Sequence, residues 1–138
     1  MIISYAVAYV PTVIVFFGLD FVWLSTISSS FYRSRIGALL VDQPNLGVAG
    51  LFYLCYVAGI VHFAVLPAVN AGTWVTALIN GALLGLVAYG TYDMTNLATI
   101  KNWSVSVSVV DMIWGVSLTA VAACCGYFVA AWTVAKAT

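Results

Sequence analysis

Residues 104–134 read SVSVSVVDMIWGVSLTAVAACCGYFVAAWTV, an apolar run of 31 residues in which Asp111 carries the only charge. A membrane-spanning helix needs about 20 mostly apolar residues, so this run is long enough to cross a bilayer. Gly115, Ala122 and Gly126 recur in it at helical spacing, and small residues in such a row let a second helix approach closely. The run therefore predicts a transmembrane helix that packs against others.

Three further apolar runs precede this one. They cover residues 3–27, 47–66 and 74–100, and short connections separate them. The four runs together use nearly all of the 138 residues. The sequence therefore predicts an all-α membrane protein, a bundle of four transmembrane helices forming a single domain over residues 1–138.

The composition supports this class. Of the residues, 64% are hydrophobic and 6% are charged, whereas a soluble domain carries about 25% charged residues. So few charges could not cover a water-facing surface. The four bases are scattered and make no basic patch, which excludes nucleic acid as a partner.

The bases also predict an orientation. Arg33, Arg35 and Lys101 lie in the first and third connections, which share one side of the membrane, and Lys136 lies in the tail on the other side. Positive residues are enriched on the cytoplasmic side. We therefore expect the first and third connections in the cytoplasm and both termini outside it.

Two segments suggest an internal repeat. Residues 20–27 (DFVWLSTI) and 93–100 (DMTNLATI) are identical at four of eight positions and end helices that cross the membrane in the same direction. They indicate a parallel two-plus-two repeat. Chance remains the alternative, because apolar segments draw on few residue types and the second and fourth helices show no matching segment.

Three aspartates lie inside the predicted spans. Asp20, Asp93 and Asp111 each stand seven residues from the predicted cytoplasmic end of their helix, which places them about 10 Å deep at 1.5 Å per residue. An aspartate at the centre of a span costs about 2.5–3.5 kcal/mol on insertion scales. Three acids from different helices at one depth are therefore the strongest functional signal in the sequence.

The helical spacing indicates that these acids face one another. Gly81, Gly85, Tyr89 and Asp93 form one stripe of the third helix, and Asn96 neighbours Asp93 one turn on. The pattern Gly81-x-x-x-Gly85 favours close helix contact. Asp93 is thus expected at a helix interface, as the principal carboxylate of a shared site with Asn96 as its polar partner.

Aromatic and basic side chains complete the candidate site. Trp23 and Trp114 each follow an aspartate of the same helix by three positions, where an indole N–H can donate to the carboxylate. Three carboxylates in a poorly hydrated site cannot all stay charged unless a cation or hydrogen-bond donors meet them. The ligand-binding candidates are Asp20, Trp23, Tyr89, Tyr92, Asp93, Asn96, Asp111 and Trp114, with His62, Arg33, Arg35 and Lys101 as secondary candidates.

The sequence offers no metal or cofactor motif. It contains one histidine, His62, which is more often a hydrogen-bonded core residue than a ligand. Clustered aspartates with a single histidine favour proton or hard-cation chemistry over zinc or haem. We therefore expect no cofactor and no resident metal.

The segment from Tyr89 to Thr99, YGTYDMTNLAT, followed by Lys101, Trp103 and Asp111, resembles a known bacterial family. It is similar to the four-span membrane family numbered 2177 among the domains of unknown function, and the likeness extends over nearly the whole chain. The resemblance implies a multi-pass protein of the bacterial inner membrane. It implies no particular activity.

Three functional hypotheses follow. The first is a protein that binds a proton, cation or small polar ligand in a cytoplasm-facing acidic pocket and works as a small transporter rather than as an enzyme. The second is an enzyme, or an accessory subunit of one, in membrane-lipid (fatty-acid) modification, with Arg33 and Arg35 placed to hold a phosphate. The third is a structural or partner-binding bundle, which predicts that the three aspartates pair off with no cavity between them. The expected partners are membrane lipids and a second copy of the chain or another membrane protein.

Overall fold

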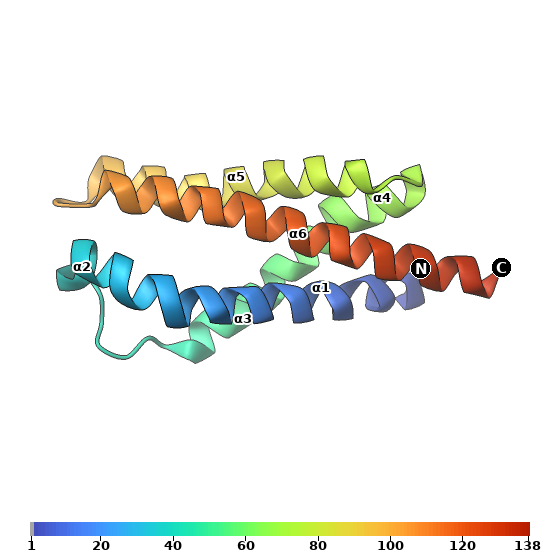
Figure 1. Cartoon of the computed structure of the whole chain (residues 1–138), viewed down its shortest axis with the longest axis horizontal. Helices are drawn as coiled ribbons and strands as arrows, with labels where there is room; N and C mark the ends of the chain where they lie inside the picture. Colours follow the sequence, from blue (N-terminus) through green and yellow to red (C-terminus); the bar gives the residue numbers. More distant parts are fainter. Residues whose placement is uncertain (1) are drawn as a thin grey trace.

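The computed structural model of the chain describes residues 2–138, and within that part every regular element is a helix (Figure 1). The elements are α1 (Ile2–Trp23), η1 (Leu24–Tyr32), α2 (Arg33–Ile36), η2 (Gly37–Leu39), α3 (Leu46–Ile60), η3 (Val61–Val65), α4 (Leu66–Ala71), α5 (Trp74–Thr99) and α6 (Val105–Ala137). They join into four continuous segments that are long and apolar enough to cross a membrane: Tyr5–Leu39, Leu46–Ala71, Trp74–Thr99 and Val105–Ala137. The predicted fold class, an all-α bundle of four transmembrane helices, is confirmed.

The first helix continues past Ile27, where the sequence predicts that the span ends. It widens into the π-helix η1, then tightens through α2 and η2 to Leu39. The hydroxyls of Ser25, Ser29 and Ser30 donate to backbone carbonyls three or four positions earlier. These bonds satisfy carbonyls in the widened segment, so the chain stays helical where its apolar run has ended.

The second helix continues through Pro67, which the sequence predicts to end or kink it. Proline has no N–H and its ring crowds the carbonyl four positions earlier, which here belongs to Phe63. The π-turn η3 lies directly before Pro67, and the side-chain amide of Asn80 on α5 donates to the Phe63 carbonyl at 3.0 Å. A neighbouring helix thus satisfies the group that proline leaves free, as an apolar surrounding requires.

Helix α6 lies at the centre of the bundle and packs against α5 on one side and α1 on the other (Figure 1). The α5 contact is close because glycine faces it. A Cβ added at Gly81 would lie 3.0 Å from the Cα of Ala120, and one added at Gly85 would lie 2.9 Å from the Cα of Val116. The close approach predicted from the Gly81-x-x-x-Gly85 pattern is therefore present, with α6 as the partner.

The second membrane-spanning segment crosses the bundle obliquely. Its first part, α3, packs on α1, whereas η3 and α4 pack on α5 (Figure 1). The connections after η2 and after α5 lie at one end of the bundle, here called the connection end, and the two chain termini lie toward the other. At the connection end α3 and α5 diverge.

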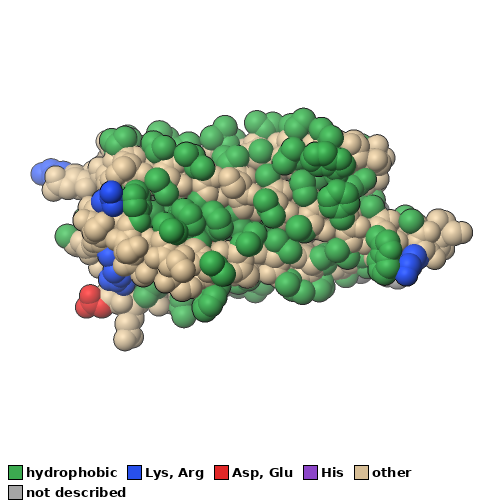
Figure 2. Space-filling view, in the orientation of Figure 1, with side chains coloured by type: hydrophobic (Ala, Val, Ile, Leu, Met, Phe, Trp, Pro, Cys, Tyr) green, Lys and Arg blue, Asp and Glu red, His purple; other side chains and the backbone are tan. Residues whose placement is uncertain are grey.

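Charged side chains are confined to the two ends of the face drawn in Figure 2, and apolar side chains cover the length between them. This distribution suits a bundle surrounded by lipid. The helices that carry the suggested repeat, α1 and α5, run in the same direction on either side of α6 (Figure 1). Their partner segments differ, because α3 to α4 is interrupted by η3 and α6 is continuous. The repeat stays a prediction.

Candidate functional site

A cavity of about 620 Å³ lies toward the connection end of the bundle, between α1 with η1, α3, α5 and α6. The three membrane aspartates, Asp20, Asp93 and Asp111, all line it. Nine aromatic residues contribute to its walls, among them Trp23, Tyr32, Tyr53, Tyr89, Tyr92 and Trp114. The fold therefore brings acids from three helices to one hollow, as their common depth predicts.

Two of the carboxyl groups are buried and incompletely paired. The side chain of Asp20 is 4% exposed, and its Oδ1 accepts a hydrogen bond from the indole of Trp114 at 3.2 Å, while its Oδ2 has no partner among the described residues. The side chain of Asp93 is 0% exposed, and neither of its oxygens has a partner in that part of the chain. The carboxyl groups of Asp93 and Asp111 are close neighbours. Asp93 is thus the least satisfied polar group of the site.

The third carboxylate is held by a short relay of aromatic donors. The Tyr32 hydroxyl donates to Oδ1 of Asp111 at 2.7 Å and accepts from the indole N–H of Trp23 at 3.2 Å. The indoles of Trp23 and Trp114 stack with their centroids 4.3 Å apart and their planes 5° from parallel. The relay and the stacked pair join η1 and α1 to α6 at the wall of the cavity.

The indole pairing differs from the one the sequence predicts. Each indole was expected to serve the aspartate of its own helix, but Trp114 of α6 donates to Asp20 of α1, and Trp23 of α1 reaches Asp111 of α6 through Tyr32. The prediction of pairing within a helix is therefore wrong. The reason is that both indoles lie in the α1–α6 interface, where stacking turns each N–H toward the opposite helix.

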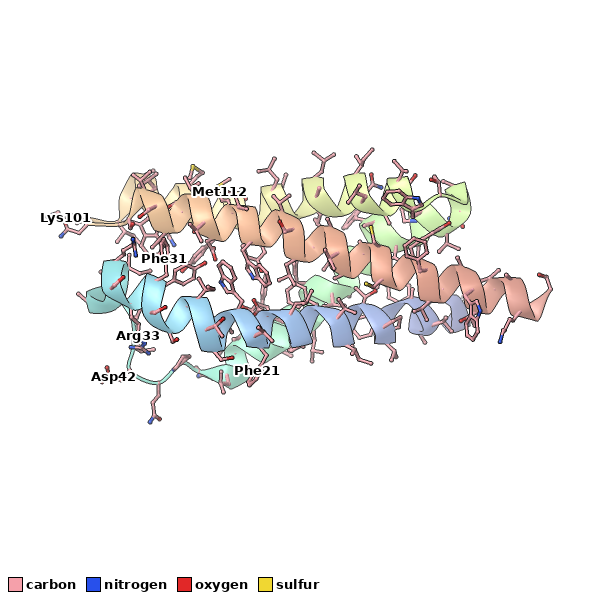
Figure 3. The ribbon with its side chains drawn as sticks, viewed as in Figure 1. Phe21, Phe31, Arg33, Asp42, Lys101 and Met112 are labelled. Atoms are coloured by element: carbon pink, nitrogen blue, oxygen red, sulfur yellow. The ribbon has the colours of Figure 1, made fainter. Side chains whose placement is uncertain are left out.

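Among the remaining principal candidates, Tyr89 and Tyr92 line the cavity and Asn96 does not. The predicted basic partners lie outside it (Figure 3). Lys101 points away from the helices at the tip of its turn, and Arg33 donates to the backbone carbonyl of Asp42. Among the residues that the structure describes, none of those that line the cavity is basic.

Arg35 is held at the surface of the connection end by its own contacts. Its guanidinium lies over the Phe31 ring, 3.8 Å from the centroid, and its Nε donates to the Ser106 hydroxyl. The lipid-enzyme hypothesis requires Arg33 and Arg35 to share a site with the acids. They do not share one in this structure.

His62 does not belong to the core. Its side chain is exposed on η3, where it contacts the Phe63 ring edge-on at 4.8 Å between centroids, and it does not line the cavity. The expectation of a hydrogen-bonded core histidine is wrong, because His62 lies on the same helical face as Cys55, seven positions earlier, which is also exposed. No three His, Cys, Asp or Glu side chains in residues 2–138 are grouped so as to hold a metal ion.

Among the cavity-lining residues that the sequence reasoning did not name as site candidates, four have an aromatic ring with a polar group: Tyr32, Tyr53, Tyr56 and Trp103. Tyr32 was expected in a surface connection, and only the continuation of the first helix through η1 brings it to Asp111. Tyr53 lies beside Asp20 because α3 packs on α1. A tyrosine hydroxyl within an apolar run is a polar group that needs a hydrogen-bond partner. That signal could have identified Tyr32 and Tyr53 as site candidates from the sequence.

Replacement of Tyr32 by phenylalanine is expected to lower the free energy of unfolding by about 1–2 kcal/mol, because Asp111 loses a donor and Trp23 loses an acceptor. The measurement is SDS-induced unfolding in mixed micelles. Tyr9→Phe is the matched control, since it removes a single hydroxyl bond, to the Leu54 carbonyl at 2.8 Å. A Tyr32→Phe cost no larger than that of the control would show that the relay contributes nothing.

The fold defines a multi-pass membrane protein made of four apolar helices. The chain belongs to the family described as predicted membrane protein (DUF2177), whose model matches residues 5–128. This confirms the family resemblance noted in the sequence. A comparison with curated proteins and with solved structures found no significant match.

Proposed function

We propose that this protein is a small transporter of the bacterial inner membrane, which binds a cation or a small ligand rich in hydrogen-bond donors between Asp20, Asp93 and Asp111. The observation that carries the proposal is the state of Asp93. Its side chain is fully buried beside a cavity, and both of its oxygens lack a partner among the described residues. A buried carboxyl group without a hydrogen-bond donor supports the proposal that a ligand supplies the missing donor.

The energetics favour a guest at this position. A buried carboxylate without a donor costs several kcal/mol, so it either keeps a proton or attracts a positive or donating group. Asp111 lies next to it, and like charges raise the cost further. The bases of the connection end are held elsewhere and do not supply the missing charge.

The walls favour an organic cation. Aromatic faces attract ammonium groups by about 0.5–2 kcal/mol, with the larger values at desolvated sites. The cavity volume of about 620 Å³ falls in the range of about 300–1,000 Å³ that small-molecule sites occupy. An ammonium group would find carboxylate oxygens on one side and aromatic rings around it.

The other hypotheses have less support. A purely structural bundle predicts three paired aspartates with no space between them, but Asp93 accepts no hydrogen bond from the described residues, has the acidic Asp111 as its neighbour and lines a cavity. A lipid-modifying enzyme would need the acids and Arg33 with Arg35 at one site, and these arginines project from the surface of the connection end.

The test compares choline with 3,3-dimethylbutan-1-ol, which has the same shape without the charge. Binding is followed by intrinsic tryptophan emission, to which Trp23 and Trp114 in the cavity wall should contribute. We expect choline to bind the wild-type protein and the neutral isostere to bind at least tenfold more weakly. Asp93→Asn should weaken choline binding at least tenfold, because the amide carries no charge.

Asp42→Asn is the matched control, since Asp42 is exposed in the connection after η2 and does not line the cavity. It should bind choline like the wild type. Equal binding of choline to wild-type and Asp93→Asn protein would refute the proposed function. So would equal affinities for choline and its isostere.

A further inference from the structure

Two of the helices that line the cavity diverge at its level. At the connection end α3 leans on α1 while α5 leans on α6, and α3 and α5 make almost no contact (Figure 1). Cavity-lining residues come from both of these diverging helices, with Phe52 and Tyr53 on α3 and Thr91 and Tyr92 on α5. The gap between α3 and α5 is therefore one side of the cavity.

The rim of this gap is apolar or aromatic and exposed. Phe52 is 65% exposed, Tyr92 is 55% exposed and Leu24 of η1 is 44% exposed, and all three line the cavity. In a bilayer such side chains contact acyl chains. A ligand entering here would come from the membrane.

The wall of the cavity toward the connection end is made of buried and half-buried side chains. Ile36 and Val107 line the cavity there with buried side chains, 5% and 2% exposed. The half-buried Trp103 lies beside them and donates its indole N–H to Ser108 at 3.0 Å. Together with Leu40, which begins the connection after η2, these side chains form the wall of the cavity at this end.

We propose that the ligand of this cavity is a membrane amphiphile with an ammonium head and an alkyl chain, which enters laterally between α3 and α5. The head lies among Asp93, Asp20 and the aromatic walls, and the chain leaves past Phe52 and Leu24 into the lipid. This inference rests on the proposed function, since it takes the acidic cavity as the binding site and names the class of ligand that the cavity accepts.

The lining residues inside the bundle differ in polarity from those at the exposed rim. The unpaired carboxylate oxygens belong to the buried side chains of Asp20 on α1 and Asp93 on α5. The exposed lining residues Leu24, Phe52 and Tyr92 are apolar or aromatic, and the Thr91 hydroxyl donates to its own helix at Val87. A water-soluble cation would leave the apolar rim unused. Each methylene of an alkyl chain buried there adds about 0.8 kcal/mol.

The experiment uses the full-length protein in dodecyl maltoside micelles and two probes, bromopropyl-trimethylammonium and bromodecyl-trimethylammonium. Bromine quenches tryptophan fluorescence on contact, so a bound probe reports itself through the cavity tryptophans. We expect the long-chain probe to quench the wild type at a concentration at least tenfold lower than the short-chain probe.

Two variants locate the entry. Thr91→Phe adds a large side chain at the rim of the gap, and Val87→Phe adds the same side chain one turn away, at a lipid-facing position outside the cavity. Thr91→Phe should weaken binding of the long-chain probe at least fivefold, and Val87→Phe should leave it within twofold of the wild type.

The outcomes separate this inference from the proposed function. If the two probes bind equally well and Thr91→Phe has no effect, while Asp93→Asn still abolishes binding, the ligand does not enter from lipid and the proposed function stands. If binding of both probes survives Asp93→Asn, the acidic site itself is refuted. Chain-length dependence that Thr91→Phe reduces and Asp93→Asn abolishes supports both.

Discussion

Asp93→Leu is expected to stabilise the protein without ligand, raising the free energy of unfolding by about 2–4 kcal/mol. Asp93 is completely buried and neither of its oxygens has a donor among the described residues, so the folded state bears the cost of desolvating the carboxyl group without compensation. Leucine has the same branching at Cγ and no polar atom. Its extra bulk can extend into the adjacent cavity.

The measurement is SDS titration of the purified protein in mixed micelles, followed by tryptophan fluorescence. Asp20→Leu should gain less than Asp93→Leu, because it sacrifices the hydrogen bond from Trp114 at 3.2 Å. Asp42→Leu, at an exposed position, should change the free energy of unfolding by less than about 0.5 kcal/mol.

The sign of the Asp93→Leu effect distinguishes a ligand site from a structural contact. A carboxylate kept for binding lowers the stability of the empty protein, whereas one kept for helix association raises it. Loss of stability in Asp93→Leu would support the structural bundle and remove the basis of the proposed function.

Gly115→Ala is expected to lower the free energy of unfolding by about 3 kcal/mol, at the upper end of the cost of overpacking. A Cβ at this position would overlap the ring of Tyr89, which packs flat on α6 at Gly115. The ring is held between helices and borders the Tyr56 ring, 6.3 Å away between centroids, so it has little room to move.

Because the nearest atoms all belong to the Tyr89 side chain, the damage should be reversible by a second substitution. In a Tyr89→Ala background, Gly115→Ala should cost less than about 0.5 kcal/mol, which corresponds to a coupling energy of about 2.5 kcal/mol in a double-mutant cycle. Additive costs in the cycle would show that the ring does not pack on Gly115.

The neighbouring glycine of the same interface gives a contrasting case. A Cβ at Gly85 would meet the backbone of Gly115 and Val116, which no side-chain truncation can move. Gly85→Ala should therefore lower stability in both the wild-type and the Tyr89→Ala background. Gly59→Ala is the matched control, because no atom lies within 4 Å of a Cβ added there.

The number of spans could be predicted because lipid imposes a one-dimensional rule on the length of a helix. A helix must be about 20 apolar residues long to cross the bilayer. The helix caps follow from local chemistry in the same way. Asn45, Thr73 and Ser104 each accept a backbone N–H two or three positions on, where α3, α5 and α6 begin.

What the sequence by itself determined is therefore the class of protein and the four apolar segments. The tertiary structure decided that Asp20, Asp93 and Asp111 line one cavity, and which groups they meet there. Because the second segment crosses the bundle obliquely, α3 diverges from α5 beside the cavity. In the α1–α6 interface, the indole of Trp114 on α6 bonds Asp20 on α1. The continuation of the first helix through η1 brings Tyr32 to Asp111. These contacts depend on how helices tilt and rotate against one another. Packing between side chains that are distant in the chain sets the tilt and rotation of each helix, which the length of its apolar segment does not determine.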